Sequence, residues 1–181
     1  MTVTDITTTT DRTAANPAMT DLAAVAPGAG DHRFFLNHLA SVKVSAGESE
    51  SQMSVVEFTA PRGFGPPLHM HRLEDEIMYL IDGEMRLDMG DESQVVTGGA
   101  VVSLPHGIPH VFQVLSDEAR FLTVTSGANG HPTFDAFVRA LGVPTDPATL
   151  PAPVEIDPGH VARVCAEYGI EVLGPPPAPL D

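Results

Sequence analysis

Short runs in which hydrophobic and polar residues alternate fill most of the chain between residues 34 and 125. In residues 84–89, for example, Met85, Leu87 and Met89 alternate with charged residues, which predicts a half-buried strand. Glycine-containing turns such as Asp82-Gly83 separate these runs. We expect further strands at 52–59, 76–81, 94–97, 100–104, 111–115 and 120–125. About eight short strands at regular intervals predict an all-β sandwich or barrel.

For two of the expected strands, the sequence also predicts which faces are buried. Residues 34–44 predict a single strand, with Phe34, Leu36 and His38 on its apolar face. Residues 76–81 are apolar on both faces, which predicts a strand that is covered on both sides. Such a strand is compatible with two copies of the chain pairing as a homodimer.

Helical patterns occur only toward the end of the chain. Residues 132–141 place apolar side chains at helical spacing and stop before Gly142. Asp157 is suited to cap a second helix that starts with Pro158 and ends at Gly169. We therefore expect three parts: a flexible arm without apolar period at 1–30, a β-barrel at 31–130, and helices with a Pro-rich tail that packs on the barrel at 131–181.

A candidate metal site follows a Pro/Gly-rich approach. His69 and His71 are two residues apart, so in a strand both rings point to one face, about 6.5–7 Å from each other. Three carboxylates follow, and spacing alone leaves open whether Glu74, Asp75 or Glu76 joins the histidines. Such a set of nitrogen and oxygen donors suits Fe, Mn, Co, Ni or Zn.

A third imidazole, His110, lies at the start of another strand after a Pro/Gly turn and would complete a site of three histidines and one carboxylate. By strand parity, Met78 shares a face with Glu76, and Phe112 shares a face with His110. The site then opens on an apolar pocket suited to an aromatic molecule. We expect the pocket to be lined by His38, Met53, Val55, Met78, Leu80, Phe112 and Val114.

Two motifs resemble the signature sequences of the cupins. They read Gly63-x5-His69-x-His71-x4-Glu76-x6-Gly83 and Gly99-x5-Pro105-x-Gly107-x2-His110. The resemblance covers residues 33–126 and departs from the family at Val114, where the second motif ends in Asn. It implies a double-stranded β-helix, the jelly-roll barrel of the cupins, with one divalent metal held by His69, His71, Glu76 and His110. The resemblance thus favours Glu76 among the three carboxylates.

Four further stretches resemble single-domain quercetinases of actinobacterial type: FGPPLHMH, EDEIMYLIDGE, LPHGIPHVF and YGIEVLGPPP. This resemblance implies a flavonol 2,4-dioxygenase that uses Ni, Co, Fe or Mn and acts on a small aromatic substrate and O2. Glu76 would be the base that deprotonates the substrate's 3-hydroxyl group at the metal.

Two other functions fit the same donor set. One is a non-oxidative cupin, an isomerase, lyase or cyclase acting on a polyketide-like enol, because a base and a Lewis acid suffice for that chemistry. The other is a cupin that only binds a ligand.

Composition limits the binding partners and the cellular compartment that we expect for this protein. The chain has 9 Lys and Arg against 24 Asp and Glu, a net charge of −15, which argues against nucleic acid or an anionic membrane as partner. The single Cys165 forms no internal disulfide, and neither a signal segment nor a membrane-spanning apolar run is evident. We expect a cytoplasmic protein.

Overall fold

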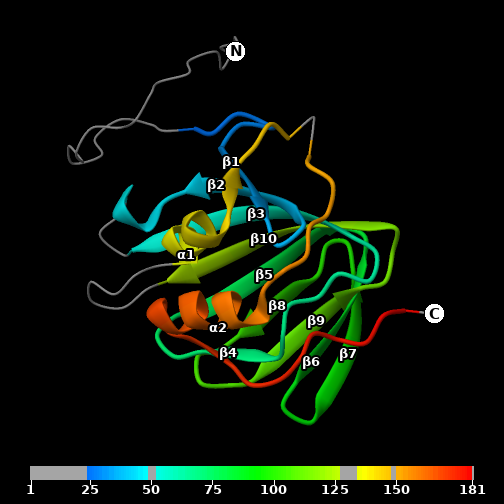
Figure 1. Ribbon diagram of the computed structural model, residues 1–181. Coiled ribbons are helices and arrows are strands. Elements are labelled where there is room, and N and C mark those ends of the chain that lie inside the picture. The colour runs from blue at the N-terminus through cyan, green and yellow to red at the C-terminus, as the bar shows by residue number, and fades with distance from the viewer. Residues whose placement is uncertain (1–23, 49–51, 127–133, 148–149, 181) are drawn as a thin grey trace.

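The computed structural model describes residues 24–48, 52–126, 134–147 and 150–180 (Figure 1). Most of the expected arm, residues 1–23, lies outside these described residues, as does the segment 127–133 that precedes the first helix. The division of the chain at residues 30 and 130 therefore stays a proposal.

Two antiparallel sheets face each other, which confirms the expected all-β fold. The larger sheet contains β1 (Asp31–Phe35), β2 (His38–Val44), β3 (Met53–Pro61), β5 (Asp75–Asp82), β8 (Val101–Leu104), β10 (Glu118–Ser126) and β11 (Val143–Pro144), in the order β11-β1-β2-β3-β10-β5-β8. The smaller sheet contains β4 (His69–His71), β6 (Glu84–Met89), β7 (Glu92–Thr97), β9 (His110–Val114) and β12 (Ile170–Val172), in the order β12-β4-β9-β6-β7. The short strands β11 and β12 were not expected.

The core lies between the two sheets, where alternate side chains of each strand are buried. In β3 the buried positions include Val56 and Phe58, and in β5 they include Met78 and Leu80. On the smaller sheet Met85 is fully buried and faces the same core. Burying one face of each antiparallel sheet removes this apolar surface from water and stabilises the fold.

The expected single strand over residues 34–44 is wrong, because the chain reverses direction within it. Leu36 and Asn37 have φ angles of 48° and 69°, and they form a two-residue turn between β1 and β2. Phe35 pairs with His38 across this hairpin, so their side chains share one face. The turn contains no glycine, and the sequence therefore carried only a weak signal for it.

Both expected helices are present, together with a short 3-10 turn at Ala46–Glu48. Helix α1 (Phe134–Leu141) packs on β1, β2 and β3, whereas helix α2 (Pro158–Glu167) packs on β12 (Figure 1). Asp157 caps α2 as expected, since its Oδ1 accepts a hydrogen bond of 2.8 Å from the Gly159 N–H.

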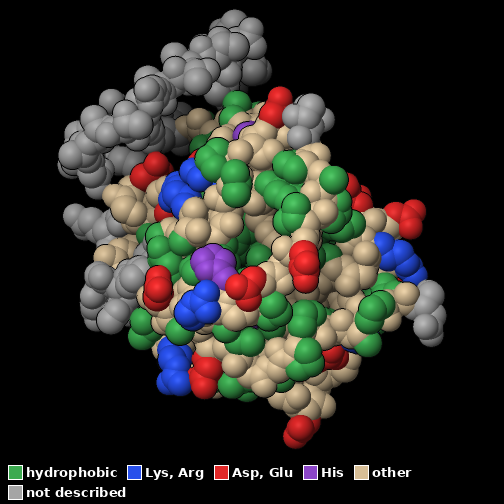
Figure 2. Space-filling model, in the orientation of Figure 1, with side chains coloured by type: hydrophobic (Ala, Val, Ile, Leu, Met, Phe, Trp, Pro, Cys, Tyr) green, Lys and Arg blue, Asp and Glu red, His purple; other side chains and the backbone are tan. Residues whose placement is uncertain are grey.

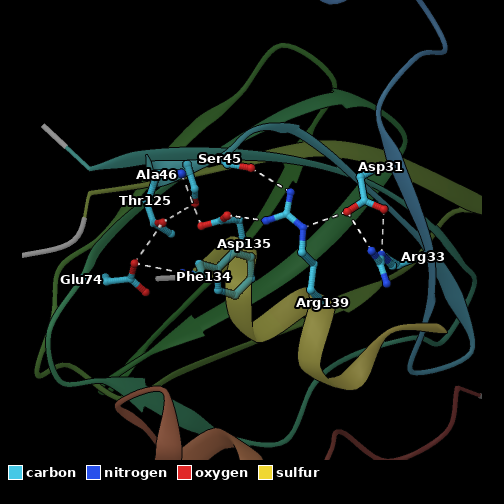
Figure 3. A network of polar contacts seen from close by, with 10 residues as sticks. Asp31, Arg33, Ser45, Ala46, Glu74, Thr125, Phe134, Asp135 and Arg139 are labelled. Atoms are coloured by element: carbon cyan, nitrogen blue, oxygen red, sulfur yellow. Dashed lines mark hydrogen bonds and ion pairs between the residues drawn. The ribbon is translucent and has the colours of Figure 1, made fainter. Parts of the chain in front are cut away.

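A polar network fastens α1 to the larger sheet (Figure 3). At its centre the Arg139 guanidinium donates to Asp135 of the same helix at 2.6 Å and to Asp31 of β1 at 2.8 Å. It also donates to the Ser45 hydroxyl, just after β2, at 2.7 Å. Asp31 in turn pairs with Arg33 at 2.8 and 2.9 Å. These contacts fix the position of the helix relative to the strands.

The surface carries side chains of mixed character. Hydrophobic side chains are interspersed with acidic and basic ones on the face that carries the helices (Figure 2). Among the described residues, no helix combines the length and the apolar character that crossing a bilayer requires. The cytoplasmic location stays a prediction.

The expectation that residues 76–81 are covered on both faces is wrong for the single chain. Glu76, Met78 and Leu80 are buried, but Ile77 and Tyr79 on the other face of β5 are 46% and 40% exposed. Val101, the register partner of Tyr79 on β8, is 66% exposed. The predicted homodimer stays a prediction, and this apolar face is the surface on which we expect it to form.

Replacing Ile77 tests that prediction. If a second copy covers this face, Ile77→Glu buries an unpaired carboxylate in the interface, and we expect a protein of monomer mass by analytical ultracentrifugation. The matched control is Val95→Glu on β7, because Val95 is 53% exposed on the other sheet. A wild-type monomer, or an Ile77→Glu protein that keeps the dimer mass, would contradict the prediction.

Candidate metal centre

Three strands from both sheets position the expected ligands. Strand β4 carries His69 and His71, and β9 carries His110, which pairs directly with His69 across the smaller sheet. Glu76 comes from β5 of the larger sheet. The site therefore forms only where the two sheets meet, from residues that are up to 41 positions apart in sequence.

The four side chains come close enough to share one cation. Each of the four residues offers one donor atom, and these atoms all lie within 4.8 Å of one another. Glu76 Oε2 lies 3.4 Å from His71 Nε2 and 3.7 Å from His110 Nε2. Atoms that each lie about 2.1 Å from one ion are separated by roughly 3 to 4 Å. The cluster is thus able to bind a metal ion.

Backbone contacts set the tautomers of two histidines. His69 Nδ1 donates to the Pro67 carbonyl at 2.8 Å, and His110 Nδ1 donates to the Ile108 carbonyl at 3.0 Å. A carbonyl only accepts hydrogen bonds, so Nδ1 carries the proton and Nε2 keeps its lone pair for an ion.

Several of these nitrogens lack any other partner. Within the described part of the chain, His110 Nε2 and both ring nitrogens of His71 are buried without a hydrogen bond. Buried polar atoms normally have a partner, since leaving them unpaired costs about 1–3 kcal/mol each. A bound cation would supply the partner for the Nε2 atoms, and the donor set therefore fits a metal.

The charges of the site suit a cation as well. Burial acts to raise the pKa of Glu76, but the rings of His110, His71 and His69 outweigh it and lower this pKa to about 2. Burial lowers the pKa of His69 to about 3 and lowers that of His71. The Thr123 hydroxyl donates to Glu76 Oε1 at 3.3 Å, which leaves Oε2 facing the histidines. An ionised carboxylate and neutral imidazoles are the protonation states that bind metal.

The other two carboxylates lie elsewhere. Glu74 is buried, and its Oε1 accepts hydrogen bonds from the Phe134 N–H at the start of α1, at 3.1 Å, and from the Thr125 hydroxyl, at 3.4 Å (Figure 3). Asp75 is exposed and pairs with His106 at 2.7 Å. Only Glu76 therefore faces the histidines, which resolves the choice that spacing left open.

The cluster lies in the wall of a cavity of about 80 Å³. Of the expected pocket residues, His38, Met78 and Phe112 line this cavity. Leu80 and Val114 are buried but do not line it, because each is two residues, about 7 Å, farther along its strand.

The expectation that Met53 and Val55 line the pocket is wrong. Both lie on the outer face of β3, where Met53 is 42% exposed. The inward residues are Ser54 and Val56, so the expected phase of this strand was wrong by one residue. The polar side chain of Ser54 can be buried because its hydroxyl forms a hydrogen bond of 2.8 Å with the Thr125 hydroxyl.

Sequence reasoning missed most of the aromatic wall. Seven of the eight phenylalanines line the cavity: Phe35, Phe58, Phe64, Phe112, Phe121, Phe134 and Phe137. Helix α2 adds Val161 and Cys165. The apolar spacing in both helices was evident, but nothing local indicated which part of the barrel they cover.

Comparison with known proteins places these features in a family. A family model described as a cupin domain matches residues 56–125, which include all four cluster residues. Residues 56–125 therefore have the sequence of a cupin domain. The chain is also 31% identical over 77 residues to the uncharacterized protein SCO3923 of Streptomyces coelicolor, covering 42% of this chain and 72% of that protein.

Two further relatives carry enzyme names. The chain is 24% identical over 102 residues to quercetin 2,3-dioxygenase of Bacillus subtilis, covering 56% of this chain and 30% of that protein. It is 34% identical over 76 residues to acireductone dioxygenase of Danio rerio, covering 39% of this chain and 40% of that protein. Among solved structures it is similar to KdgF from Halomonas sp., with a TM-score of 0.46 and 18% identity over 61% of this chain and 88% of that one.

Removing one donor tests the metal site. We expect His110→Ala to weaken Co²⁺ binding at least about 100-fold, because even residues that only support a ligand contribute 10- to 100-fold. Isothermal titration calorimetry and metal analysis of the purified protein measure this. The control is His106→Ala, four residues earlier and exposed. Equal affinities of the two variants would contradict the assignment.

Glu74 provides a pH-dependent test of the adjoining network. Burial raises the pKa of Glu74 from 4.5 to about 7, so the folded protein binds more protons than the unfolded chain between these values. The stability contributed by this group is present below pH 4.5 and is lost as pH rises through about 7. Glu74→Gln stays neutral, so relative to the wild type its free energy of unfolding should rise by up to about 3 kcal/mol between pH 4.5 and 8.

Urea unfolding of chelator-treated proteins at several pH values measures this difference. The exposed Glu92→Gln serves as control. A difference between Glu74→Gln and wild type that is constant with pH would show that Glu74 ionises normally in the folded protein.

Proposed function

We propose that this protein is a metal-dependent dioxygenase that cleaves the heterocycle of a flavonol such as quercetin. The observation that carries the proposal is a cluster of three histidines and one glutamate on a cavity whose wall is largely phenylalanine. The similarity to the Bacillus subtilis protein named quercetin 2,3-dioxygenase supports it, although this chain spans only 30% of that protein's length.

In this proposal the four cluster residues, His69, His71, Glu76 and His110, hold one divalent ion, Ni, Co, Fe or Mn. When bound, such an ion supplies Lewis acidity and open coordination positions for a substrate oxygen or O2. Backbone carbonyls hold the rings of His69 and His110 in place, so the donors need little rearrangement.

Glu76 is the proposed base. Its lowered pKa keeps it ionised at neutral pH. Once it has swung off the ion, Oε2 would take the proton of the substrate's 3-hydroxyl group, whose acidity a bound ion would raise. The Thr123 hydroxyl would keep hold of Oε1 and steady the carboxylate during the transfer. The phenylalanine wall would stack on the flavonol rings and exclude water. The overall reaction consumes one O2 and releases carbon monoxide and a depside.

The size of the cavity favours a second candidate. A volume of about 80 Å³ is smaller than the roughly 300–1,000 Å³ of typical ligand pockets, so a flavonol would require the aromatic wall to move apart. A smaller enol would need less movement. The second candidate is therefore an enzyme for such an enol, either a non-oxidative isomerase, lyase or cyclase, or a dioxygenase for a compact substrate, as the name of the Danio rerio relative indicates for that protein. A cupin that only binds its ligand is the remaining alternative.

A turnover assay separates these functions. The protein is loaded with Ni, Co, Fe or Mn, and quercetin absorbance is followed in air and without O2. We expect turnover that requires both the metal and O2, with kcat reduced at least about 100-fold in Glu76→Gln because the base is lost. Asp75→Asn, the neighbouring exposed carboxylate, is the control and should keep wild-type turnover.

Each other outcome points to a different function. No quercetin turnover with any of the four ions removes the flavonol proposal. Conversion of an enol that continues without O2 identifies the non-oxidative enzyme. Binding of ligand that survives Glu76→Gln, with no turnover by the wild type, identifies a binding protein.

A further inference from the structure

His38 forms part of the cavity wall apart from the metal cluster. Its ring contacts Phe35 and Phe58, each at a centroid distance of 5.4 Å, and Phe64 at 4.0 Å. Among the described residues it makes no ring contact with the three cluster histidines. The side chain is 2% exposed. An imidazole thus lies within an aromatic cage in an otherwise apolar part of the cavity.

The hydrogen bond on one side of the ring assigns its tautomer. His38 Nδ1 lies 3.2 Å from the Leu36 carbonyl oxygen, which only accepts, so Nδ1 carries the proton. Burial lowers the pKa of His38 to about 4, so the ring is neutral at physiological pH. Nε2 therefore keeps a lone pair and is a hydrogen-bond acceptor.

No neighbouring group uses this acceptor. Within the part of the chain that the structure describes, Nε2 of His38 has no hydrogen-bond partner. The hydroxyl of Thr123, which also lines the cavity, already donates to Glu76. An acceptor on the cavity wall that no protein group pairs with is suited to a donor on a molecule that enters the cavity.

The backbone around His38 is also held firmly. The left-handed turn at Leu36 and Asn37 places His38 opposite Phe35. The Asn37 amide donates to the Val154 carbonyl at 2.9 Å, and its oxygen accepts from the Val154 N–H at 2.9 Å. This pair of bonds ties the turn to the connector between α1 and α2. Such support is what a residue that orients a ligand requires.

We propose that His38 is a specificity-determining residue whose Nε2 accepts a hydrogen bond from a substrate hydroxyl remote from the oxygen that the metal cluster binds. This inference rests on the proposed function and defines its substrate class more closely. The substrate is an aromatic enol with a second hydroxyl group at the other end of the molecule. An enol without that second hydroxyl would bind less tightly.

Binding in the absence of O2 tests the inference separately from turnover. Dissociation constants of the Ni-loaded protein are measured anaerobically for quercetin and for 3-hydroxyflavone, which has only the metal-binding hydroxyl. We expect His38→Phe, which keeps an aromatic ring but loses the acceptor, to weaken quercetin binding about five- to tenfold. Binding of 3-hydroxyflavone should change less than about twofold. His106→Phe, at an exposed position outside the cavity, is the control.

A second measurement uses the unmodified protein and so does not depend on the folding of a variant. In the diamagnetic Zn-loaded protein, the ¹⁵N resonance of His38 Nε2 should shift on addition of quercetin and stay in place with 3-hydroxyflavone. A role in packing alone would not produce this difference.

The outcomes distinguish this inference from the proposed function. Equal weakening of both ligands by His38→Phe, no weakening of either, or no binding of either by the wild type would overturn the role of His38. Turnover of quercetin that His38→Phe leaves unchanged, in KM as well as kcat, would overturn it while leaving the dioxygenase intact. Selective loss of quercetin binding in a protein that never consumes O2 would support His38 and refute the dioxygenase.

Discussion

The need to satisfy ring nitrogens and a carboxylate buried between two apolar sheets is the constraint on which the rest of the structure depends. Glu76 is 5% exposed, and His71 and His110 are each 2% exposed. Groups this deeply buried are stable only when each has a partner of suitable charge. Thr123 supplies a partner for Glu76, and backbone carbonyls supply partners for His69 and His110; the Nε2 and Oε2 atoms that remain face one another. Their arrangement leaves room for a cation and makes this the chemical centre of the fold.

The aromatic wall and the helices follow from the same arrangement. A charged centre is chemically effective when water is excluded around it, and the phenylalanines provide an apolar surrounding. Phe134 and Phe137 reach the cavity only because α1 is held against the sheet. The network around Arg139 and the hydrogen bond from the Phe134 N–H to Glu74 hold it there. Contacts outside the cavity thus determine what lines it.

Local patterns in the sequence predicted the strands well where one face is clearly apolar. Strand β6, with Met85 and Leu87 inward, has the expected phase. Prediction failed where both phases carry apolar residues. In β3 the exposed Met53 and Val55 are as apolar as the buried Val56, and pairing with β10 decides the phase. The hairpin between β1 and β2 was missed because two non-glycine residues adopt the left-handed conformation.

By itself the sequence determined the all-β class, both helices, and the placing of His69 and His71 on one face, because these follow from short-range periodicity and capping. Only the tertiary structure decided which carboxylate faces the histidines, since Glu74 and Glu76 share strand parity but only one points between the sheets toward the rings. It also decided that His38 and the helices share one cavity. These outcomes depend on contacts between distant segments, and their free energies are not encoded in any local stretch of the chain.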